Sequence, residues 1–274
     1  MAEPPPLPQK EDRWALFLDV DGTLVPIAET PSAVRVGDDL VPLLQSAQAG
    51  CYGALALVSG RPLAALDSLF APLVLPAAAL HGQERRRGDG VVLSPPAPKA
   101  ALAAVRPALA DYAAAHAGLI LEDKGDSLAL HYRLASERGD AVRRLARDLA
   151  QDQPLLRLIE GRKVVEFVPL GADKGSAIAA FMAEPPFAGC VPVYAGDDTT
   201  DEDGFAEVNR RGGVSIKVAS PETDGAAGGT AARYRVASVV DLRDWLRGVT
   251  DRFAARSQCG PPPQRQGTPC LPAC

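Results

Sequence analysis

The amino-acid sequence predicts an α/β fold, in which a mainly parallel sheet with flanking helices carries a second, inserted α+β unit. Short apolar runs alternate with segments of helical periodicity before about residue 82 and again after about residue 169, a pattern typical of parallel sheets. Between these blocks the order changes to strand, helix, two strands, helix, two strands. Polar residues directly follow several apolar runs, as expected where the ligand crevice of an open α/β sheet lies.

The first apolar run, residues 15–18, ends abruptly and is predicted to be a buried strand that leads into a tight turn. Asp19 and Asp21 follow it one residue apart, and Gly22 and Thr23 come next. Two carboxylates at a desolvated strand end repel each other, and a bound cation is the simplest compensation. The alternative is an ordinary Asp-Gly turn that is solvated and inert.

The remaining elements continue this alternation. In the flanking blocks we expect helices over residues 40–50, 63–70, 175–183, 201–209 and 241–248, and strands over residues 54–58, 74–80, 190–195 and 214–218. In the intervening block we expect helices over residues 99–116, which Pro107 should kink or split, and 137–151, with strands over residues 91–93, 119–124, 127–133, 155–159 and 163–168. The predicted organisation is a flexible N-terminal arm (1–12), a catalytic core (13–82 and 169–250), an inserted α+β cap domain (83–168) and a disordered tail (257–274).

Composition limits the classes of partner. The 274 residues include 29 Lys and Arg against 34 Asp and Glu, so the formal net charge is −5, which gives no reason to expect nucleic acid or an anionic membrane. No apolar run approaches the roughly 20 residues that span a bilayer. The acidic, proline-rich start does not resemble a signal peptide, and the five cysteines do not suggest a disulfide framework or a zinc site. A cytoplasmic location is therefore the expectation.

Polar side chains at several predicted strand ends indicate phosphoryl transfer. Carboxylates such as Asp19 and Asp197 supply the hard oxygen ligands that Mg²⁺ prefers. A hydroxyl and a lysine at helix starts, Ser59 and Lys174, suit a phosphate group. Taken singly, each has another interpretation, because Ser59 and the pair Asp197–Asp198 could cap helices and Lys174 could be solvated. Their order along one chain favours a common site with an aspartate nucleophile.

The same residues resemble a known family. Asp19-Val-Asp-Gly-Thr23, Ser59, Lys174 and Gly196-Asp-Asp198 resemble the four motifs of the haloacid dehalogenase-like (HAD) phosphatases. Within them, the stretches 19–27, 58–62, 80–84 and 196–205 are similar to the trehalose-6-phosphate phosphatase family. The resemblance extends from about residue 14 to about residue 248. It implies a Rossmann-like HAD core with a C2-type cap and an Mg²⁺-dependent hydrolysis of trehalose 6-phosphate through an aspartyl-phosphate.

The resemblance also implies roles for individual residues in the core. Asp19 would be the nucleophile, and Asp21, oriented by Thr23, would be the general acid and base. The phosphoryl oxygens would be held by Thr23, Ser59, Gly60 and Lys174. Mg²⁺ would be bound by the Asp19 carboxylate, the Asp21 carbonyl and Asp197, with support from Asp198 and Asp201.

In the inserted unit, the resemblance implies a sugar-binding surface. Its residues would be Glu122, Lys124, Arg133, Arg162 and Glu166, whose alternative interpretation is a solvated charged face. Gln83 departs from the family pattern, in which a small residue is expected after His81-Gly82. His81 could line the site near the phosphate, but we expect it to be a loop histidine with satisfied hydrogen bonds. Trp14 and Trp245 are expected to be packing residues rather than sugar platforms.

Alternative functions are left open by the sequence. The same chemistry could act on sucrose phosphate or another sugar phosphate. A catalytically silent sugar-phosphate-binding regulatory subunit, or a phospho-receiver, is the alternative from another class, although receivers lack an acid at the position of Asp21. A functional pairing with a trehalose-phosphate synthase is a further expectation.

Overall fold

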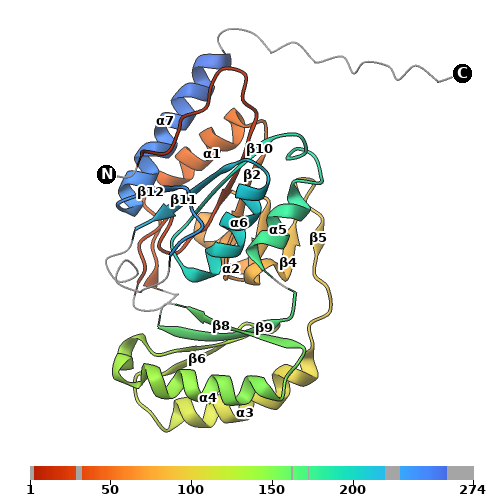
Figure 1. The fold of residues 1–274 in the computed structure, drawn as a ribbon, viewed down its shortest axis with the longest axis vertical. Helices are drawn as coiled ribbons and strands as arrows, with labels where there is room; N and C mark the ends of the chain where they lie inside the picture. Colours follow the sequence, from red (N-terminus) through yellow and green to blue (C-terminus); the bar gives the residue numbers. More distant parts are fainter. Residues whose placement is uncertain (1–2, 29–32, 162, 172, 220–228, 258–274) are drawn as a thin grey trace, which may run out of the picture.

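The computed structural model describes residues 3–28, 33–161, 163–171, 173–219 and 229–257 (Figure 1). The tail beyond residue 257 and Arg162, both subjects of predictions, lie outside these residues. The chain forms a larger unit around an eight-stranded sheet and a smaller unit around a four-stranded sheet. The predicted α/β class is confirmed, because six strands of the larger sheet are parallel and helices flank it.

The larger sheet has the strand order β12-β11-β10-β1-β2-β3-β4-β5. The strand bounds are β1 (Trp14–Leu18), β2 (Leu55–Val58), β3 (Ala77–Ala79), β4 (Glu84–Arg86), β5 (Val92–Leu93), β10 (Val191–Gly196), β11 (Val214–Val218) and β12 (Tyr234–Val236). Strand β1 lies in the middle, and Leu18 pairs in register with Ala195 on β10 and Leu57 on β2. The polar residues that follow these three strands are therefore brought to one edge of the sheet.

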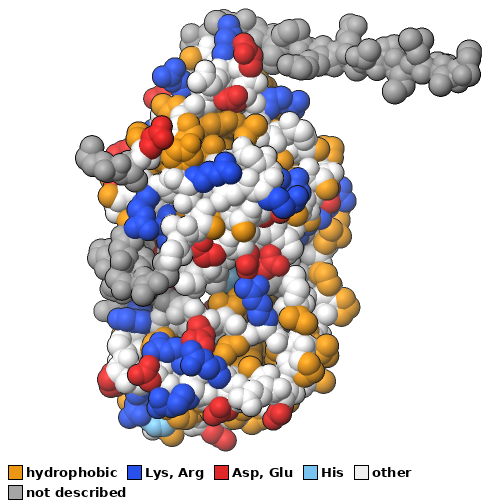
Figure 2. All heavy atoms as spheres, in the orientation of Figure 1, with side chains coloured by type: hydrophobic (Ala, Val, Ile, Leu, Met, Phe, Trp, Pro, Cys, Tyr) orange, Lys and Arg blue, Asp and Glu red, His pale blue; other side chains and the backbone are white. Residues whose placement is uncertain are grey.

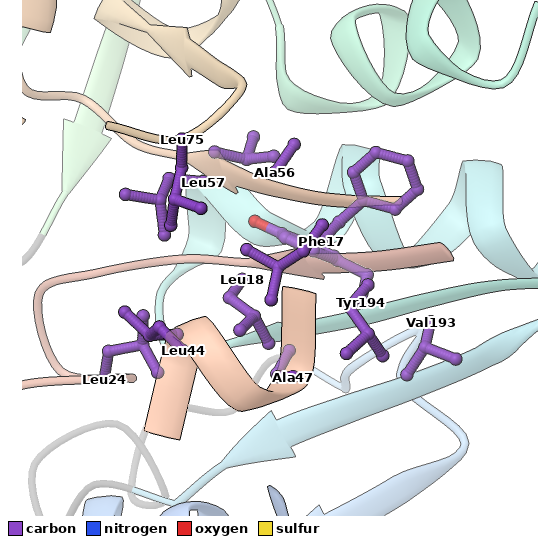
Figure 3. Close-up of a cluster of buried hydrophobic side chains, with 14 of the residues drawn as sticks. Phe17, Leu18, Leu24, Leu44, Ala47, Ala56, Leu57, Leu75, Val193 and Tyr194 are labelled. Atoms are coloured by element: carbon purple, nitrogen blue, oxygen red, sulfur yellow. The ribbon is translucent and has the colours of Figure 1, made fainter. Parts of the chain in front are cut away.

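Helices cover the two faces of this sheet. They are α1 (Leu40–Gly50), α2 (Leu63–Phe70), α5 (Lys174–Phe181), α6 (Glu202–Arg210) and α7 (Val239–Ser257). Successive residues of β1 point to opposite faces. Leu18 lies with Leu44 and Ala47 of α1 on one face, as Figure 3 shows. On the face of α5, Phe17 stacks on Phe187 and packs at a tilt against Phe181.

The smaller unit has its own hydrophobic core. Its sheet has the antiparallel order β6-β7-β9-β8, with β6 (Ile120–Asp123), β7 (Leu128–His131), β8 (Leu156–Gly161) and β9 (Val164–Pro169). Helices α3 (Lys99–Ala114) and α4 (Gly139–Gln151) cover the face away from the larger unit (Figure 1). The apolar face of α3, formed by Leu102, Val105 and Leu109, is buried against this sheet.

The structure corrects the predicted start of the inserted unit. Residues 84–93 were expected in that unit, but β4 pairs antiparallel with β3 and β5 pairs antiparallel with β4, so both extend the larger sheet. Two arginines anchor this hairpin, because Arg85 forms an ion pair with Glu184 at 2.8 Å and Arg86 one with Asp67 at 2.7 Å. The consecutive arginines of β4, Arg85 and Arg86, are thus explained by ion pairs that anchor the hairpin, and sequence periodicity cannot reveal such contacts.

Part of the predicted N-terminal arm contacts the core. The Trp245 indole Nε1–H donates to the Pro6 carbonyl at 3.0 Å, and Leu7 packs on the core near Gly248. Trp14 stacks on Trp245 with ring centroids 6.3 Å apart, which confirms that both tryptophans are packing residues.

Short 3₁₀ helices complete the described elements: η2 (Leu80–Gly82), η3 (Arg133–Arg138) and η4 (Thr199–Asp201). None of the helices in the described residues has the length and apolar character needed to cross a bilayer.

Candidate active site

The polar site is built around Asp19, which directly follows β1. Its backbone N–H donates to the Ala195 carbonyl at 3.0 Å, so the strand pairing fixes its position. The side chain is only 5% exposed. Its Oδ1 accepts a hydrogen bond from Lys174 Nζ at 2.9 Å, and its Oδ2 accepts one from Thr23 Oγ1 at 3.2 Å. Burial raises the pKa of Asp19 to about 7, although Lys174 opposes the increase.

Lys174 stands at the start of α5, where the positive end of the helix dipole disfavours a cation. Two buried carboxylates compensate, because its Nζ donates to Asp19 at 2.9 Å and to Asp201 at 2.6 Å. Burial alone would lower the pKa of Lys174, but the charges of Asp19 and Asp201 raise it above its ordinary value. Lys174 is therefore a permanent cation at the floor of the site.

Three carboxylates gather at this point and fit a metal ion. One oxygen from each of Asp19, Asp197 and Asp201 lies within 4.8 Å of the others. Asp197 Oδ2 is buried and has no hydrogen-bond partner among the described residues. Burial, and then the charges of Asp19 and Asp201, raise the pKa of Asp197 well above its ordinary value. An all-oxygen set with one buried, unpaired ligand atom suits a hard divalent cation.

A glycine is required beside this cluster. Gly22 has a φ of +84°, and a Cβ atom there would lie 2.1 Å from Asp197 Oδ2. Any other residue would displace the carboxylate of Asp197. The glycine of the first motif is thus explained by both its backbone conformation and its approach to the acidic cluster.

The structure differs from the predicted role of Asp198. Its Oδ1 accepts the backbone N–H of Thr199 at 2.7 Å and caps η4, so its carboxylate is outside the three-carboxylate cluster. Asp201 joins the cluster in its place. Asp201 is fully buried and accepts the backbone N–H groups of Asp197 and Asp198, both at 2.8 Å. Of the two interpretations of the acid pair, capping thus applies to Asp198 and the cluster contains Asp197.

The structure also corrects the predicted partner of Asp21. Thr23 Oγ1 donates to Asp19 and, at 3.4 Å, to Asp197, and not to Asp21. Arg61 holds Asp21 instead, with Nε and Nη2 at 2.6 and 2.7 Å from its two oxygens. The sequence analysis missed this residue, although its place directly after Ser59 and Gly60 was an available signal.

The loop after β2 brings Ser59 and Gly60 to the same site. Ser59 is 1% exposed, and its Oγ accepts the backbone N–H of Arg61 at 3.2 Å. It does not cap α2, whose N-cap is Pro62 without a side-chain hydrogen bond. Gly60 is packed against the ring of His81, since a Cβ there would lie 2.6 Å from His81 Nε2. The capping alternative for Ser59 is therefore excluded.

A pocket opens between these residues and the smaller unit. Its wall includes Asp19, Asp21, Ser59, Gly60, Lys174 and Asp197 from the larger unit, and Glu122, Lys124, Arg133 and Glu166 from the smaller one. In Figure 2, acidic and basic side chains lie on both sides of the junction between the units. Among the described residues, the predicted core and sugar-binding residues thus line one cavity, except for Thr23 and Asp201, which are fully buried.

Glu166 is the most connected acid of the smaller unit. Its Oε1 accepts from Lys124 Nζ at 2.9 Å and Ser127 Oγ at 2.7 Å, and its Oε2 lies 3.1 Å from His81 Nε2. Burial would raise the pKa of Glu166, but Lys124 and His81 outweigh it and hold the pKa below its usual range. Lys124 Nζ also donates to the Gly60 carbonyl at 3.0 Å, which links the two units.

The other predicted sugar-binding residues have specific partners as well. Glu122 Oε2 lies 2.8 Å from His131 Nε2, a hydrogen bond that lowers the pKa of Glu122. Arg133 Nη1 donates to the Ala28 carbonyl of the larger unit at 2.9 Å. Gln83, which departs from the family pattern, is buried and donates to the Pro95 carbonyl at 2.6 Å. His131 is a pocket residue that the sequence analysis missed.

Comparisons with known proteins agree on one family. Residues 17–239 match the family described as trehalose-phosphatase. The chain is 42% identical over 243 residues to a trehalose-6-phosphate phosphatase of Escherichia coli (strain K12), covering 89% of each protein. It is 46% identical over 211 residues to a probable trehalose-phosphate phosphatase of Sinorhizobium fredii, covering 77% of this chain and 79% of the other.

A solved structure shows that the fold is shared. The C-terminal domain of the C. albicans trehalose-6-phosphate phosphatase superposes with a TM-score of 0.77 at 19% identity, covering 90% of this chain and 99% of that one. At this identity the likeness concerns the fold alone.

Proposed function

The chain belongs to the trehalose-phosphatase family, and on that premise we propose that it hydrolyses trehalose 6-phosphate to trehalose and phosphate through an aspartyl-phosphate at Asp19. It is a phosphoric monoester hydrolase with the HAD fold, and the family implies a divalent metal and a small sugar-phosphate substrate. We further propose Mg²⁺ as the metal, a cytoplasmic location and a functional pairing with a trehalose-phosphate synthase. The observation that carries the proposal is the buried contact of Asp19 with Lys174 at the pocket floor.

In the first chemical step, an oxygen of Asp19 attacks phosphorus and the bond from phosphorus to the sugar oxygen breaks. Asp21 donates a proton to that leaving oxygen. In the second step, Asp21 takes a proton from water, the water oxygen attacks phosphorus, and the bond to Asp19 breaks. Asp19 is regenerated, phosphate leaves, and no net charge or proton is unaccounted for.

The remaining residues orient the phosphoryl group. Lys174, Ser59 and the loop at Gly60 would hold its oxygens, and Thr23 orients the Asp19 carboxylate from which attack begins. Asp19, Asp197 and the Asp21 carbonyl would hold Mg²⁺. When bound, the cation supplies positive charge that reduces repulsion between Asp19 and the phosphoryl oxygens.

We propose that the smaller unit is a cap domain that recognises the sugar. Its support is that Glu122, Lys124, Arg133 and Glu166 reach the wall of the same pocket from the opposite side. The charged hydrogen-bonding groups there match the hydroxyl groups of a disaccharide. The division into a core and a cap follows the two separate hydrophobic clusters.

Phosphate release from several sugar phosphates, with the full chain and Mg²⁺, tests the substrate. We expect the highest kcat/KM with trehalose 6-phosphate, and faster turnover of sucrose 6-phosphate or glucose 6-phosphate would contradict the proposal.

Asp19→Asn should lower kcat by about 10⁴-fold or more, because it removes the nucleophile but keeps the shape. The matched Asp148→Asn, at an exposed site on α4, should stay within about twofold. A phosphate adduct on the Asp19 peptide after acid quenching should be present in the parent protein and absent from Asp19→Asn.

A further inference from the structure

A strained turn after β3 carries a buried histidine that the reaction scheme does not use. Leu80, His81 and Gly82 are consecutive and have φ angles of +48°, +56° and +106°. Positive φ is uncommon for residues other than glycine, and for a bulky leucine it is an outlier. Such strain persists where the surrounding structure fixes it, and it concentrates at functional sites.

The turn fixes the His81 ring against the phosphate-binding loop proposed above. The backbone N–H of His81 donates to the Ser59 carbonyl at 3.0 Å. The ring lies so close to Gly60 that a Cβ atom there would be 2.6 Å from Nε2. His81 is thus held at a fixed place relative to Ser59 and Gly60.

From that place the ring reaches the smaller unit. His81 Nε2 lies 3.1 Å from Glu166 Oε2, and the two side chains are 9% and 6% exposed. An ionised carboxylate only accepts hydrogen bonds, so Nε2 must carry the proton of this contact. Nδ1 is buried with no hydrogen-bond partner in the part of the chain that the structure describes. The ring is therefore oriented so that Nε2 contacts Glu166, although this leaves Nδ1 buried without a hydrogen-bond partner among the described residues.

The two oxygens of Glu166 are held from different units. Lys124 and Ser127, both from the smaller unit, donate to Oε1, whereas His81 contacts Oε2 from the larger unit. A carboxylate with both oxygens engaged in this way has a defined orientation relative to both units.

We propose that His81 is a positioning residue, which orients the Glu166 carboxylate relative to the phosphate-binding loop and so aligns sugar recognition with phosphoryl transfer. The sugar-binding role of Glu166 is part of the proposed function, and this inference rests on it. His81 itself takes no part in bond making or breaking. Its loss should therefore affect substrates that carry the sugar and spare a small aryl phosphate.

Two amide substitutions separate this role from a purely structural one. The amide nitrogen of glutamine can replace Nε2 of histidine, whereas that of asparagine can replace only Nδ1. Asparagine tolerates positive φ better than most residues, so a role limited to the turn would favour Asn over Gln. The proposed role favours Gln over Asn, because only glutamine can reach Glu166.

The test measures kcat and KM of the full chain with Mg²⁺ on trehalose 6-phosphate and on p-nitrophenyl phosphate. We expect His81→Asn to lower kcat/KM on the sugar phosphate by about 10-fold to 100-fold, and His81→Gln by about threefold or less. Both should stay within about threefold of the parent on the aryl phosphate. His116→Gln, just after α3 and outside the pocket wall, is the matched histidine control and should change neither.

A double-mutant cycle tests whether His81 acts through Glu166. In a Glu166→Ala background, His81→Asn should cost about twofold or less on the sugar phosphate, since the contact is already lost. An undiminished effect there, equal losses on both substrates, or better activity of Asn than Gln would overturn the inference. Unfolding of both single variants, followed by near-UV circular dichroism, would likewise assign His81 to the fold and overturn it.

Failure of the proposed function is a separate outcome. A parent protein that hydrolyses another sugar phosphate better than trehalose 6-phosphate contradicts the proposed substrate. The His81 variants are then compared on that preferred substrate, where the same Gln-over-Asn order is expected.

Discussion

At the scale of single residues, Asp21 shows most clearly how the structure refines the proposed chemistry. Two guanidinium nitrogens of Arg61 hold both of its oxygens. This two-point contact fixes the plane of the carboxylate as well as its position. Lysine offers a single flexible charge and cannot reproduce it. Arg61 therefore fixes the ionised carboxylate of Asp21, and one oxygen must leave the guanidinium before it can carry the proton that Asp21 delivers.

We predict that Arg61→Lys lowers kcat/KM on trehalose 6-phosphate by about 10-fold or more, as the loss of a charge-assisted pair implies. The loss should be smaller on p-nitrophenyl phosphate, because a nitrophenolate leaves without much help from an acid. Steady-state kinetics on the two esters measure the difference. Arg86→Lys is the matched control, since Arg86 binds Asp67 through two nitrogens and does not line the pocket. Equal losses of Arg61→Lys on both esters would contradict a role in leaving-group protonation.

The sequence was informative about residues at strand ends and less so about their partners. Asp19, Lys174 and Asp197 could be brought together because each follows or begins a predicted element of a parallel sheet. The partner of Thr23 and the separate orientations of Asp197 and Asp198 could not be predicted, because they depend on side-chain directions after a turn. Periodicity carries no information on these directions.

At the scale of elements, segments with regular apolar spacing were predicted well, whereas strand β12 and the end of helix α7 were not. The bounds of α1 and α2 agree with the prediction, because their apolar spacing is regular. Strand β12, with only three residues and an exposed Arg235, was missed, since it has no apolar run. Helix α7 continues beyond Gly248, its predicted end, and buries Val249 and Phe253 in the core.

Pro107 gives an element-scale prediction. Helix α3 runs unbroken through this exposed residue, so the predicted split of the helix does not occur. A proline inside a helix is about 3 kcal/mol less favourable than alanine, and about 1 kcal/mol of this is offset because proline restricts the unfolded chain. We therefore predict that Pro107→Ala raises the free energy of unfolding of the smaller unit by about 2 kcal/mol.

Urea denaturation followed by far-UV circular dichroism measures this change. Ala104→Gly, at an exposed site on the same helix, serves as a control of opposite sign and should cost about 1 kcal/mol. A lower midpoint for Pro107→Ala would show that the proline ring makes a stabilising contact.

At the scale of the whole molecule, two separate hydrophobic cores meet across a polar junction. The described contacts between the units are hydrogen bonds and ion pairs, such as Lys124 with Gly60, Arg133 with Ala28, and Arg157 with Asp203 at 2.8 Å. Polar junctions of this kind are typical of units that move relative to each other. A sugar phosphate carries groups that can replace several of these contacts.

The charge balance at the centre of the molecule determines how its stability should depend on pH and metal. Burial raises the pKa of Asp19 from its ordinary value of 3.8 to about 7, and that of Asp197 also rises. Between about pH 4 and pH 7 the folded protein therefore binds more protons than the unfolded chain. The stability that these protonated groups contribute is present below pH 4 and is lost as the pH rises through about 7. The pKa values of Asp201 and Glu166 are lowered from ordinary values of 3.8 and 4.5, so their contribution to stability is complete by about pH 5.5 and stays constant above it.

We predict that the metal-free protein loses several degrees of Tm between about pH 5.5 and pH 8, because Asp19 and Asp197 must ionise next to each other. Mg²⁺ binds the ionised carboxylates, so the increase in Tm on adding it should be larger at the higher pH. Thermal unfolding with EDTA or with Mg²⁺ across this range measures both effects. Asp197→Asn should reduce the pH dependence and remove most of the response to Mg²⁺, whereas Asp148→Asn should change neither. A metal-free protein that becomes more stable toward pH 8 would show that the acidic cluster is compensated by the protein alone, and it would remove the electrostatic reason for a cation at this site.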